Sequence, residues 1–464
     1  MFAEQEVRDP IHGFIFREPS EQGIVDTPIF QRLRRLKQLA LAYEVYPGAV
    51  HTRFEHSLGA FHVACRMAKA LQLSPEEARL VRLAALLHDV GHGPFSHVSE
   101  PILQKYRNGT RVKLAAKQQI HELITAQILR DNKELASWIL EKDREKVIGI
   151  LEGSSGYSVL HDIVSGPLDA DKQDYLLRDS YFCGVKYGIY DIEFLISSLR
   201  LHADAEDKYL AISGNGIYAL EQFVLAKYYM KTQVYQHRIR LITDQMIERG
   251  ISLGIEVDKL GWLRDLYGYD GSPEHLDNYI GWTDDRLMTR ALEESSDCRV
   301  KSVFTRLVDR RLLKCILDID EKDLAEPAVR MKLFAETDES DKFHRALEAM
   351  IAGRFKFGED NDLVICKLVS FPSAVKTESE ILVVEPGKKE SRFHEKSVIF
   401  GTVNEAILKQ KFQIYAPVTY KDEKDRNKRR REYREEILGM IGKLAALHQT
   451  ERPNGVNSEK LRAL

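Results

Sequence analysis

Histidine and aspartate residues recur along the chain in a pattern that suits a bound metal ion. His56 lies upstream of the adjacent pair His88-Asp89, and Asp171 lies downstream. Mixed imidazole and carboxylate ligands suit an octahedral divalent ion such as Mn²⁺, Fe²⁺ or Mg²⁺. Adjacent residues do not share a helix face, but at a helix end beside Gly91 both members of the pair can point at one ion. Four protein ligands leave positions open for water and a phosphate oxygen, which hydrolysis requires.

More histidines surround these candidate metal ligands. His92 and His97 follow the pair within the same loop, and His121-Glu122 opens another predicted helix. Because histidine titrates near neutral pH, such a cluster can donate protons and bind phosphate oxygens. The pattern therefore favours hydrolysis of a phosphorylated substrate.

A purely structural role is the usual explanation for a single histidine on an amphipathic helix. We interpret His62 and His237 in that way, and a His-Asp pair alone is weak support for a metal site. The ordered run from Ala85 to His97, with a histidine-bearing helix before it and an aspartate after it, is much harder to explain by packing alone. The metal-binding interpretation is therefore favoured for the whole set.

The elements that carry these residues are predicted to be helices. Ser74-Pro75 is typical of a helix start, with serine as the N-cap and proline at the first helical position. Apolar residues recur at three- and four-residue steps in many segments. The predicted helices are 27–40, 53–71, 74–87, 119–130, 134–141, 170–178, 217–249 and 284–319.

Short β-prone segments lie mainly in the last quarter of the chain. They cover residues 209–213, 363–369, 381–384 and 412–415. Runs of this length and composition are typical of strands. We therefore expect a mostly α fold with a smaller C-terminal α/β subdomain.

The composition excludes several classes of protein. Hydrophobic residues make up 44% of the 464 residues and charged residues 30%, which suits a globular protein with a sizeable core. A net charge of -3 gives no general attraction to nucleic acid or membrane. The five scattered cysteines form no C-x-x-C pair, and neither a targeting segment nor an apolar span is visible. We expect a soluble, cytoplasmic protein with reduced thiols.

Three long blocks resemble the HD-domain deoxynucleoside triphosphate (dNTP) triphosphohydrolases. They are residues 53–59, residues 88–97 and residues 169–179, and residues 282–285 (Trp-Thr-Asp-Asp) resemble the bacterial members. The resemblance is dense from residue 6 to 249 and thinner to about residue 320. It implies an HD-domain helical core. We expect a catalytic core over 1–250, a helical extension over 251–360, and a C-terminal α/β subdomain with a charged tail over 361–464.

The resemblance also implies roles for the candidate residues. His56, His88, Asp89 and Asp171 match the metal ligands of the family. The residues that match those around the triphosphate, where water attacks the α-phosphorus, are His92, His97, His121 and Glu122. His97 is then the candidate that protonates the departing 5′ oxygen. Glu100 stands where some relatives have Asp, so its longer side chain changes a proton-transfer geometry.

The same resemblance implies which residues contact the substrate. Arg53 and Lys172 match phosphate-holding positions, and Gln38, Tyr175 and Asp179 match contacts to the deoxyribose. Tyr235, followed by Gln236, matches an aromatic that packs against C2′ and leaves no room for a 2′-hydroxyl, although the residue type alone favours an ordinary core aromatic. Lys227 and Lys231 stand where the mammalian member of this family has Arg and His. A lysine keeps a phosphate contact possible but cannot bind phosphate through two parallel hydrogen bonds as arginine does.

A second nucleotide site is implied near the N-terminus. Asp26, Gln31 and Arg34 match residues that hold a guanine nucleotide, GTP or dGTP, which promotes tetramer assembly and activity in the family. The alternative is a helix N-terminus with a solvated basic face. The resemblance thus implies a dNTP substrate, a nucleotide activator and a homo-oligomer, with a tetramer favoured.

Two other functions stay open at this stage. The first is another HD-type phosphohydrolase, either a nucleoside monophosphatase or a guanosine tetraphosphate hydrolase, which would have no need of the sugar contacts. The second is a nucleic-acid-binding regulatory protein, supported by the basic run 428–431. Acidic residues flank that run, which favours a salt-bridged helix. Our leading hypothesis is metal-dependent hydrolysis of dNTP to deoxynucleoside and inorganic triphosphate.

Overall fold

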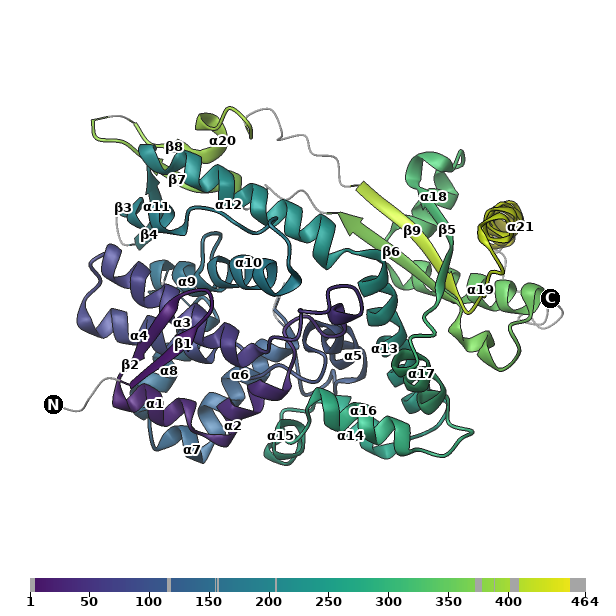
Figure 1. The fold of residues 1–464 in the computed structure, drawn as a ribbon, viewed down its shortest axis with the longest axis horizontal. Helices are drawn as coiled ribbons and strands as arrows, with labels where there is room; N and C mark the ends of the chain where they lie inside the picture. The colour runs from purple at the N-terminus through teal and green to yellow at the C-terminus, as the bar shows by residue number, and fades with distance from the viewer. Residues whose placement is uncertain are drawn as a thin grey trace. The chain divides into compact units, whose positions relative to one another are not determined.

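The computed structural model describes most of the chain. It covers residues 5–114, 118–154, 156, 158–204, 207–371, 378–387, 389–400 and 409–450. The chain folds into two compact units, each made of two separate stretches (Figure 1). The first combines Met1–Thr305 with Ala374–Glu405, and the second combines Arg306–Ser373 with Ala406–Leu464. The division at residues 250 and 360 that we expected from the sequence stays a prediction.

The first unit is mostly helical. Its helices in the first half are α1 (Pro19–Val25), α2 (Pro28–Gln31), α3 (Arg53–Ala70), α4 (Pro75–Leu87), α5 (Ser99–Tyr106), α6 (Ile120–Asp131), α7 (Lys133–Ala136), α8 (Glu141–Leu151), α9 (Ser158–Ser165) and α10 (Ala170–Cys183). They continue with α11 (Ile192–Ser197), α12 (Ile217–Tyr229), α13 (Arg238–Glu256), α14 (Gly261–Tyr267), α15 (Pro273–Ile280), α16 (Asp284–Glu293), α17 (Arg299–Val308), which runs into the second unit, and α20 (Phe393–Lys396). Short 3-10 turns link several of them, among them η1 (Arg32–Arg35), η3 (Ser96–Val98) and η8 (Glu378–Glu380).

Two small sheets complete the first unit. β1 (Gln5–Asp9) and β2 (Gly13–Arg17) form an antiparallel hairpin. The second sheet has the strand order β3-β4-β7-β8. β3 (Leu199–Asp204) pairs antiparallel with β4 (Asp207–Ser213), whereas β7 (Leu382–Val384) pairs parallel with β4 and β8 (Ser391–Arg392) closes the sheet. A segment from late in the sequence is thereby tied to the helical core beside α12 (Figure 1).

The centre of the first unit is the packing of α3 against α4 and α10. A capping box formed by Thr52 and Glu55 starts α3, and Ser74 caps α4 as the sequence predicts. Gly59 lies where α10 crosses α3, and a Cβ there would lie 1.9 Å from the Asp174 carboxylate. The helices can therefore approach closely only because residue 59 is glycine.

The second unit is a three-stranded antiparallel sheet with helices. The strand order is β5-β9-β6, formed by β5 (Lys314–Asp320), β6 (Ile365–Phe371) and β9 (Lys409–Ala416). Its helices are α18 (Pro327–Phe334), α19 (Asp338–Phe355) and α21 (Glu423–Thr450). Fully buried Leu347, Phe412 and Ile437 belong to its core. The prediction of a mostly α fold with a smaller α/β part is confirmed.

Four predicted helices are wrong in extent. The stretch 134–141 is helical only up to Ala136, where α7 ends, and α8 begins at Glu141 after a turn. Residues 27–40 form only α2 and η1, because the chain then turns so that Lys37 bridges to Thr52. The stretch 284–319 contains two helices and strand β5, whose apolar residues face the second core. The stretch 217–249 is α12, then the π-helical turn η5 (Met230–Tyr235), then α13. Tertiary packing overrides local periodicity in these stretches.

The structure also bears on membrane association. Within the described ranges, no helix combines the length and apolar composition needed to cross a membrane.

We predict that Gly59→Ala destabilises the first unit by about 1–3 kcal/mol, because the added methyl group overlaps the Asp174 carboxylate. Calorimetric unfolding measures the effect. The matched control is Gly353→Ala in α19, where a Cβ meets nothing within 4 Å and alanine should stabilise the helix by about 0.5–1 kcal/mol. Equal stability of Gly59→Ala and the natural protein would contradict the close approach.

Candidate active site

Three elements bring the candidate metal ligands together. His56 lies in the first turn of α3, His88 and Asp89 follow the last turn of α4, and Asp171 lies in the first turn of α10. His56 and Asp89 are buried, with 1% and 4% of their surface exposed. The glycine turn after α4 is required, because a Cβ on Gly91 would lie 2.2 Å from a carbonyl oxygen of α6.

Hydrogen bonds fix how the two histidines point. Nδ1 of His56 lies 2.8 Å from Oδ2 of Asp174, and Nδ1 of His88 lies 2.8 Å from the carbonyl oxygen of Ala85. Nδ1 of His88 therefore donates its proton, and the same tautomer suits His56. Both Nε2 atoms are buried without a hydrogen-bond partner in the described structure. Metal-binding imidazoles have this arrangement, with one nitrogen tied to an acceptor and the other left for the ion.

Distances within the set fit one divalent ion. Nε2 of His56 lies 3.0 Å from Oδ1 of Asp171, and Nε2 of His88 lies 3.9 Å from the same oxygen. One ligand atom from each of His56, His88 and Asp171 lies within 4.8 Å of the others. Ligand bonds of about 2.1 Å in an octahedron place neighbouring ligands about 3 Å apart and opposite ones about 4 Å apart. These residues can therefore hold a metal ion with little movement.

Asp89, the fourth candidate metal ligand, also contacts Arg53 and His92. Its Oδ1 is 3.4 Å from Nε2 of His88 and 3.3 Å from Nε2 of His92, and its Oδ2 is 3.6 Å from Nε2 of His56. Arg53 donates to Oδ2 at 2.6 Å. Burial alone would raise the pKa of Asp89, but Arg53 and the histidines hold it well below its usual range. Asp89 is therefore ionised and available to an ion.

A buried ionic network holds Asp174, the hydrogen-bond partner of His56 Nδ1, in place. Oδ2 of Asp174 accepts from Nε of Arg178 at 2.8 Å, and Nη1 of Arg178 donates to Asp9 at 2.8 Å. His12 reaches the other oxygen of Asp174 at 2.7 Å. Burial would raise the pKa of Asp174, but Arg178 and the two histidines keep it well below its usual range. The sequence interpretation missed this network. Residues 171, 174 and 178 are spaced so that they share one face of a helix. That spacing could have revealed the Asp174–Arg178 pair from the sequence.

The remaining histidines form a second group beside Asp89. The rings of His92 and His121 stack with centroids 3.8 Å apart, and the His97 ring lies 5.0 Å from His92. Nδ1 of His121 lies 2.7 Å from Oε1 of Glu100. Ligand atoms of His92, His121 and Glu100 also lie within 4.8 Å of one another. The structure thus brings four of the five candidate catalytic residues together.

Glu122 has a different position. Its side chain is exposed and accepts from the backbone N–H of Gln119 at 3.1 Å, which caps the start of α6. Glu100 accepts from two backbone N–H groups of the same helix start, at Ile120 and His121. The catalytic role of Glu122 stays a prediction, and its capping role is what the structure shows.

A strained loop carries the sequence from His92 to His97. Phe95 and Ser96 both have positive φ angles, 61° and 55°, which are unfavourable for residues with side chains. Asp284, at the start of α16, accepts from the N–H of Phe95 at 2.7 Å and of Lys37 at 2.9 Å. Ser96 in turn accepts from Arg53 at 2.8 Å. The Trp282–Asp285 motif therefore holds the histidine loop in position.

Two candidate sugar contacts, Tyr175 and Tyr235, lie near Asp179. The hydroxyl of Tyr235 donates to Asp179 at 2.6 Å, and Nε2 of His51 lies 2.8 Å from the same carboxylate. The Tyr175 ring lies 6.1 Å from that of Tyr235 and 6.5 Å from that of His56. Tyr235 ends the π-helical turn η5, a geometry that is often found at functional sites. His51 was missed by the sequence interpretation.

The candidate phosphate contacts have partners within the chain. Lys172 donates to Asp169 at 2.5 Å, and Lys227 pairs with Glu378. Nη2 of Arg53 and Oε1 of Gln38 are buried and have no hydrogen-bond partner in the described ranges. Gln236 follows Tyr235 at the end of η5. Arg53 and Gln38 thus have polar atoms left for a ligand.

Comparison with known proteins agrees with this geometry. Residues 53–179 match the HD domain, and residues 190–431, more than half of the chain, match the HD-associated region. The chain belongs to the HD-domain family. The HD domain match begins at Arg53 and ends at Asp179, and so includes all four candidate metal ligands.

Several relatives of this HD-domain chain are known. A Methanocaldococcus jannaschii protein described as uncharacterized is 36% identical over 264 residues, 57% of this chain and 52% of that protein. Deoxynucleoside triphosphate triphosphohydrolase SAMHD1 of Gallus gallus is 33% identical over 341 residues, 66% of this chain and 55% of that protein. The SAMHD1 of Danio rerio is 28% identical over 342 residues, 66% of this chain and 54% of that protein. The chain spans about half the length of these relatives.

Solved structures share the fold. A hypothetical protein from Aquifex aeolicus has a TM-score of 0.69 and 27% identity, covering 93% of this chain and all of that one. A phosphohydrolase from Bacteroides thetaiotaomicron has the same TM-score and identity and covers 89% of this chain. The likeness extends well beyond the HD domain itself.

The residues expected to bind a regulatory nucleotide lie close together before the HD domain. Gln31 donates to the carbonyl oxygen of Val25 at 2.8 Å and accepts from Nε of Arg34 at 2.8 Å. Asp26 is exposed and accepts from Gln22 at 2.8 Å. The guanidinium of Arg34 lies 3.4 Å from the Phe54 ring centroid. Whether these residues bind a nucleotide stays a prediction.

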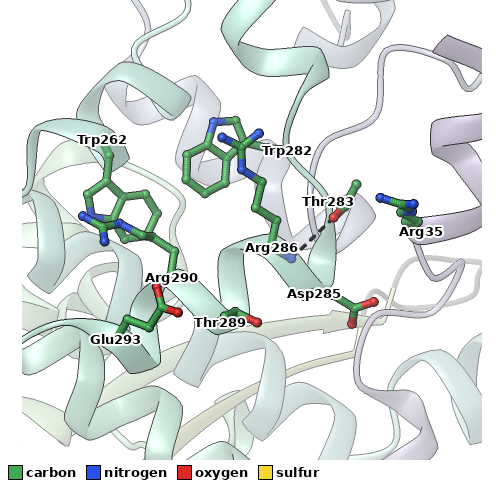
Figure 2. Close-up of a pocket in the computed structure, with 9 residues that line it drawn as sticks. All are labelled: Arg35, Trp262, Trp282, Thr283, Asp285, Arg286, Thr289, Arg290 and Glu293. Atoms are coloured by element: carbon green, nitrogen blue, oxygen red, sulfur yellow. Dashed lines mark hydrogen bonds between the residues drawn. The ribbon is translucent and has the colours of Figure 1, made fainter. Parts of the chain in front are cut away.

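A separate pocket of about 660 Å³ lies beside α16 (Figure 2). Asp285, Arg286 and Arg290 of that helix line it, opposite Arg35 of η1. The rings of Trp262 and Trp282 stack with centroids 5.1 Å apart, and Arg286 lies 4.5 Å from the Trp282 centroid. Both indoles are therefore already covered on one face by a partner within the chain.

We predict that Asp174→Asn lowers metal affinity about 10- to 100-fold, because it weakens the acceptor that orients His56. Titration of the metal-free protein with Mn²⁺ measures the effect, with circular dichroism to verify folding. The control is Glu193→Gln, which removes an exposed carboxylate that pairs with Arg66 on α3. A folded Asp174→Asn protein with unchanged affinity would show that the network does not support the metal site.

Proposed function

We propose that this HD-domain phosphohydrolase cleaves dNTP into deoxynucleoside and inorganic triphosphate. The observation that carries the proposal is the convergence of the buried Nε2 atoms of His56 and His88 with the carboxylates of Asp89 and Asp171. The match to SAMHD1, which is named for this activity, supports the choice of substrate. A divalent ion held by these residues would polarise water and a phosphate oxygen, the chemistry that phosphate hydrolysis needs.

The chain's own residues supply charge and proton transfer. Arg53 has a buried Nη2 without a partner among the described residues and can hold a phosphate oxygen as negative charge develops. His92 can accept a proton from the attacking water. Its ring stacks on that of His121, which in turn binds Glu100. Burial and the charge of Arg53 lower the pKa of His97 to about 3. The negative charge of a bound triphosphate would raise that pKa, so that His97 can protonate the departing 5′ oxygen once substrate is bound. Water adds to the α-phosphorus as the bond to O5′ breaks.

Substrate selection is assigned to the group around Asp179. Tyr235 is fixed by its hydrogen bond to Asp179, which also binds His51, so the ring cannot swing away easily. A fixed aromatic against C2′ would exclude a 2′-hydroxyl. Gln38, Tyr175 and Gln236 complete the proposed sugar contacts, and Lys172 and Lys227 complete the proposed phosphate contacts.

Regulation and assembly are proposed on the same resemblance. Asp26, Gln31 and Arg34 would bind a guanine nucleotide, and the protein would act as a homo-oligomer, with a tetramer favoured. We propose a cytoplasmic location and Mn²⁺, Mg²⁺ or Fe²⁺ as the metal. No role in binding nucleic acid is proposed, because the basic run 428–431 lies in α21, where Lys428 approaches Glu432 at 3.9 Å.

The test is chromatography of the products formed from each dNTP with Mn²⁺ or Mg²⁺, alone and with GTP or dGTP. We expect deoxynucleoside and triphosphate, and in H₂¹⁸O the label should appear only in triphosphate. His88→Ala should be inactive, whereas His161→Ala, which changes a histidine bonded to the carbonyl of Ile150, should stay active. Orthophosphate or pyrophosphate as product would reassign the reaction, and activity in His88→Ala would contradict the metal-site assignment.

A further inference from the structure

A carboxylate from late in the sequence lies among the lysines beside the candidate active site. Glu378 begins η8, has no exposed surface, and pairs with Lys227 of α12. The Lys227 side chain keeps 20% of its surface exposed. Because burying a carboxylate is costly unless it is paired, the lysine stabilises Glu378 in its buried position.

Glu378 also acts on groups nearer to the metal ligands. Burial lowers the pKa of Lys231, and the charge of Glu378 opposes that shift. The pKa of Tyr175 is well above its ordinary value through burial and through carboxylates that include Glu378. Glu378 therefore lies within electrostatic reach of Lys231 and Tyr175.

The segment that carries Glu378 is firmly built into the first unit. Its strand β7 pairs with β4, and Phe393 of α20 has no exposed surface. Ser397 donates to Glu221 at 2.5 Å. The segment is thus attached to α12 at two points, Glu221 and Lys227, almost two helical turns apart. Figure 1 shows α20 and β7 running beside α12.

We propose that Glu378 is an internal competitor for the lysines that bind the far phosphates of the substrate. This inference rests on the proposed function, in which a triphosphate extends from the metal ligands toward Lys227. An anion long enough to reach Lys227 must displace the Glu378 carboxylate. An anion of one phosphate can bind beside the metal ligands without disturbing it. Substrate binding is thereby coupled to displacement of the Glu378 side chain from Lys227.

A purely structural role for the Lys227–Glu378 pair makes a different prediction. If the pair only fastens the segment, its loss should reduce stability and leave anion affinity unchanged. If Glu378 competes with phosphate, its neutralisation should strengthen binding of long anions alone. The dependence on anion length therefore separates the two roles.

The experiment is calorimetric titration of the full chain with inorganic triphosphate and with orthophosphate, with and without Mn²⁺. Glu378→Gln should bind triphosphate about tenfold more tightly than the natural protein, with orthophosphate affinity unchanged, because one opposing charge is removed. Glu380→Gln is the matched control. It neutralises a carboxylate of the same turn that is 64% exposed and should change neither affinity.

A second variant keeps the test decisive if Glu378→Gln does not fold. Ser397→Ala weakens the other attachment of the segment and should also tighten triphosphate binding. Unchanged or weaker triphosphate binding in the folded variant, or an equal gain for orthophosphate, would overturn the proposal. Failure to hydrolyse dNTP would refute the proposed function instead, because these titrations measure anion binding without catalysis.

Discussion

Arg178 is fully buried between Asp174 and Asp9, and it binds both carboxylates at 2.8 Å. Its position can be maintained only if α10 crosses α3 closely, which the glycine at position 59 allows. The same Asp174 orients His56. The chain cannot lose this ionic network without leaving a charge unpaired in the core, a cost of several kcal/mol. Fold stability and the geometry of the candidate metal site therefore depend on one buried interaction.

The site gathers segments that are far apart in the sequence. The hairpin contributes Asp9, the end of α4 contributes His88 and Asp89, and the start of α16 contributes Asp284. Asp284 stabilises a loop with two unfavourable backbone conformations, so the loop keeps His97 near His92. Two candidate metal ligands thus lie in the first turns of α3 and α10, the other two lie in the turn that ends α4, and a strained loop carries His97.

Much of this arrangement could be predicted from the sequence, and the reasons for failure differ by element. Caps and apolar periodicity predicted the helices after Thr52 and Ser74 because their signals are local. The helix expected at 27–40 was wrong because the backbone at Lys37 bridges to Thr52 and binds Asp284. These contacts impose an extended conformation in place of a helix. The contacts of Asp9 and Glu378 join positions more than 140 residues apart, and no local pattern encodes such pairs.

The central claim is that His56, His88, Asp89 and Asp171 hold one divalent ion in the geometry that Asp174 and Arg178 maintain. Anomalous diffraction from crystals grown with Mn²⁺ tests it most directly. We predict a single strong peak among those four residues, within about 2.0–2.3 Å of His56 Nε2, His88 Nε2 and a carboxylate oxygen of each aspartate. A peak among His92, Glu100 and His121 instead, or no peak in an active protein, would contradict the claim.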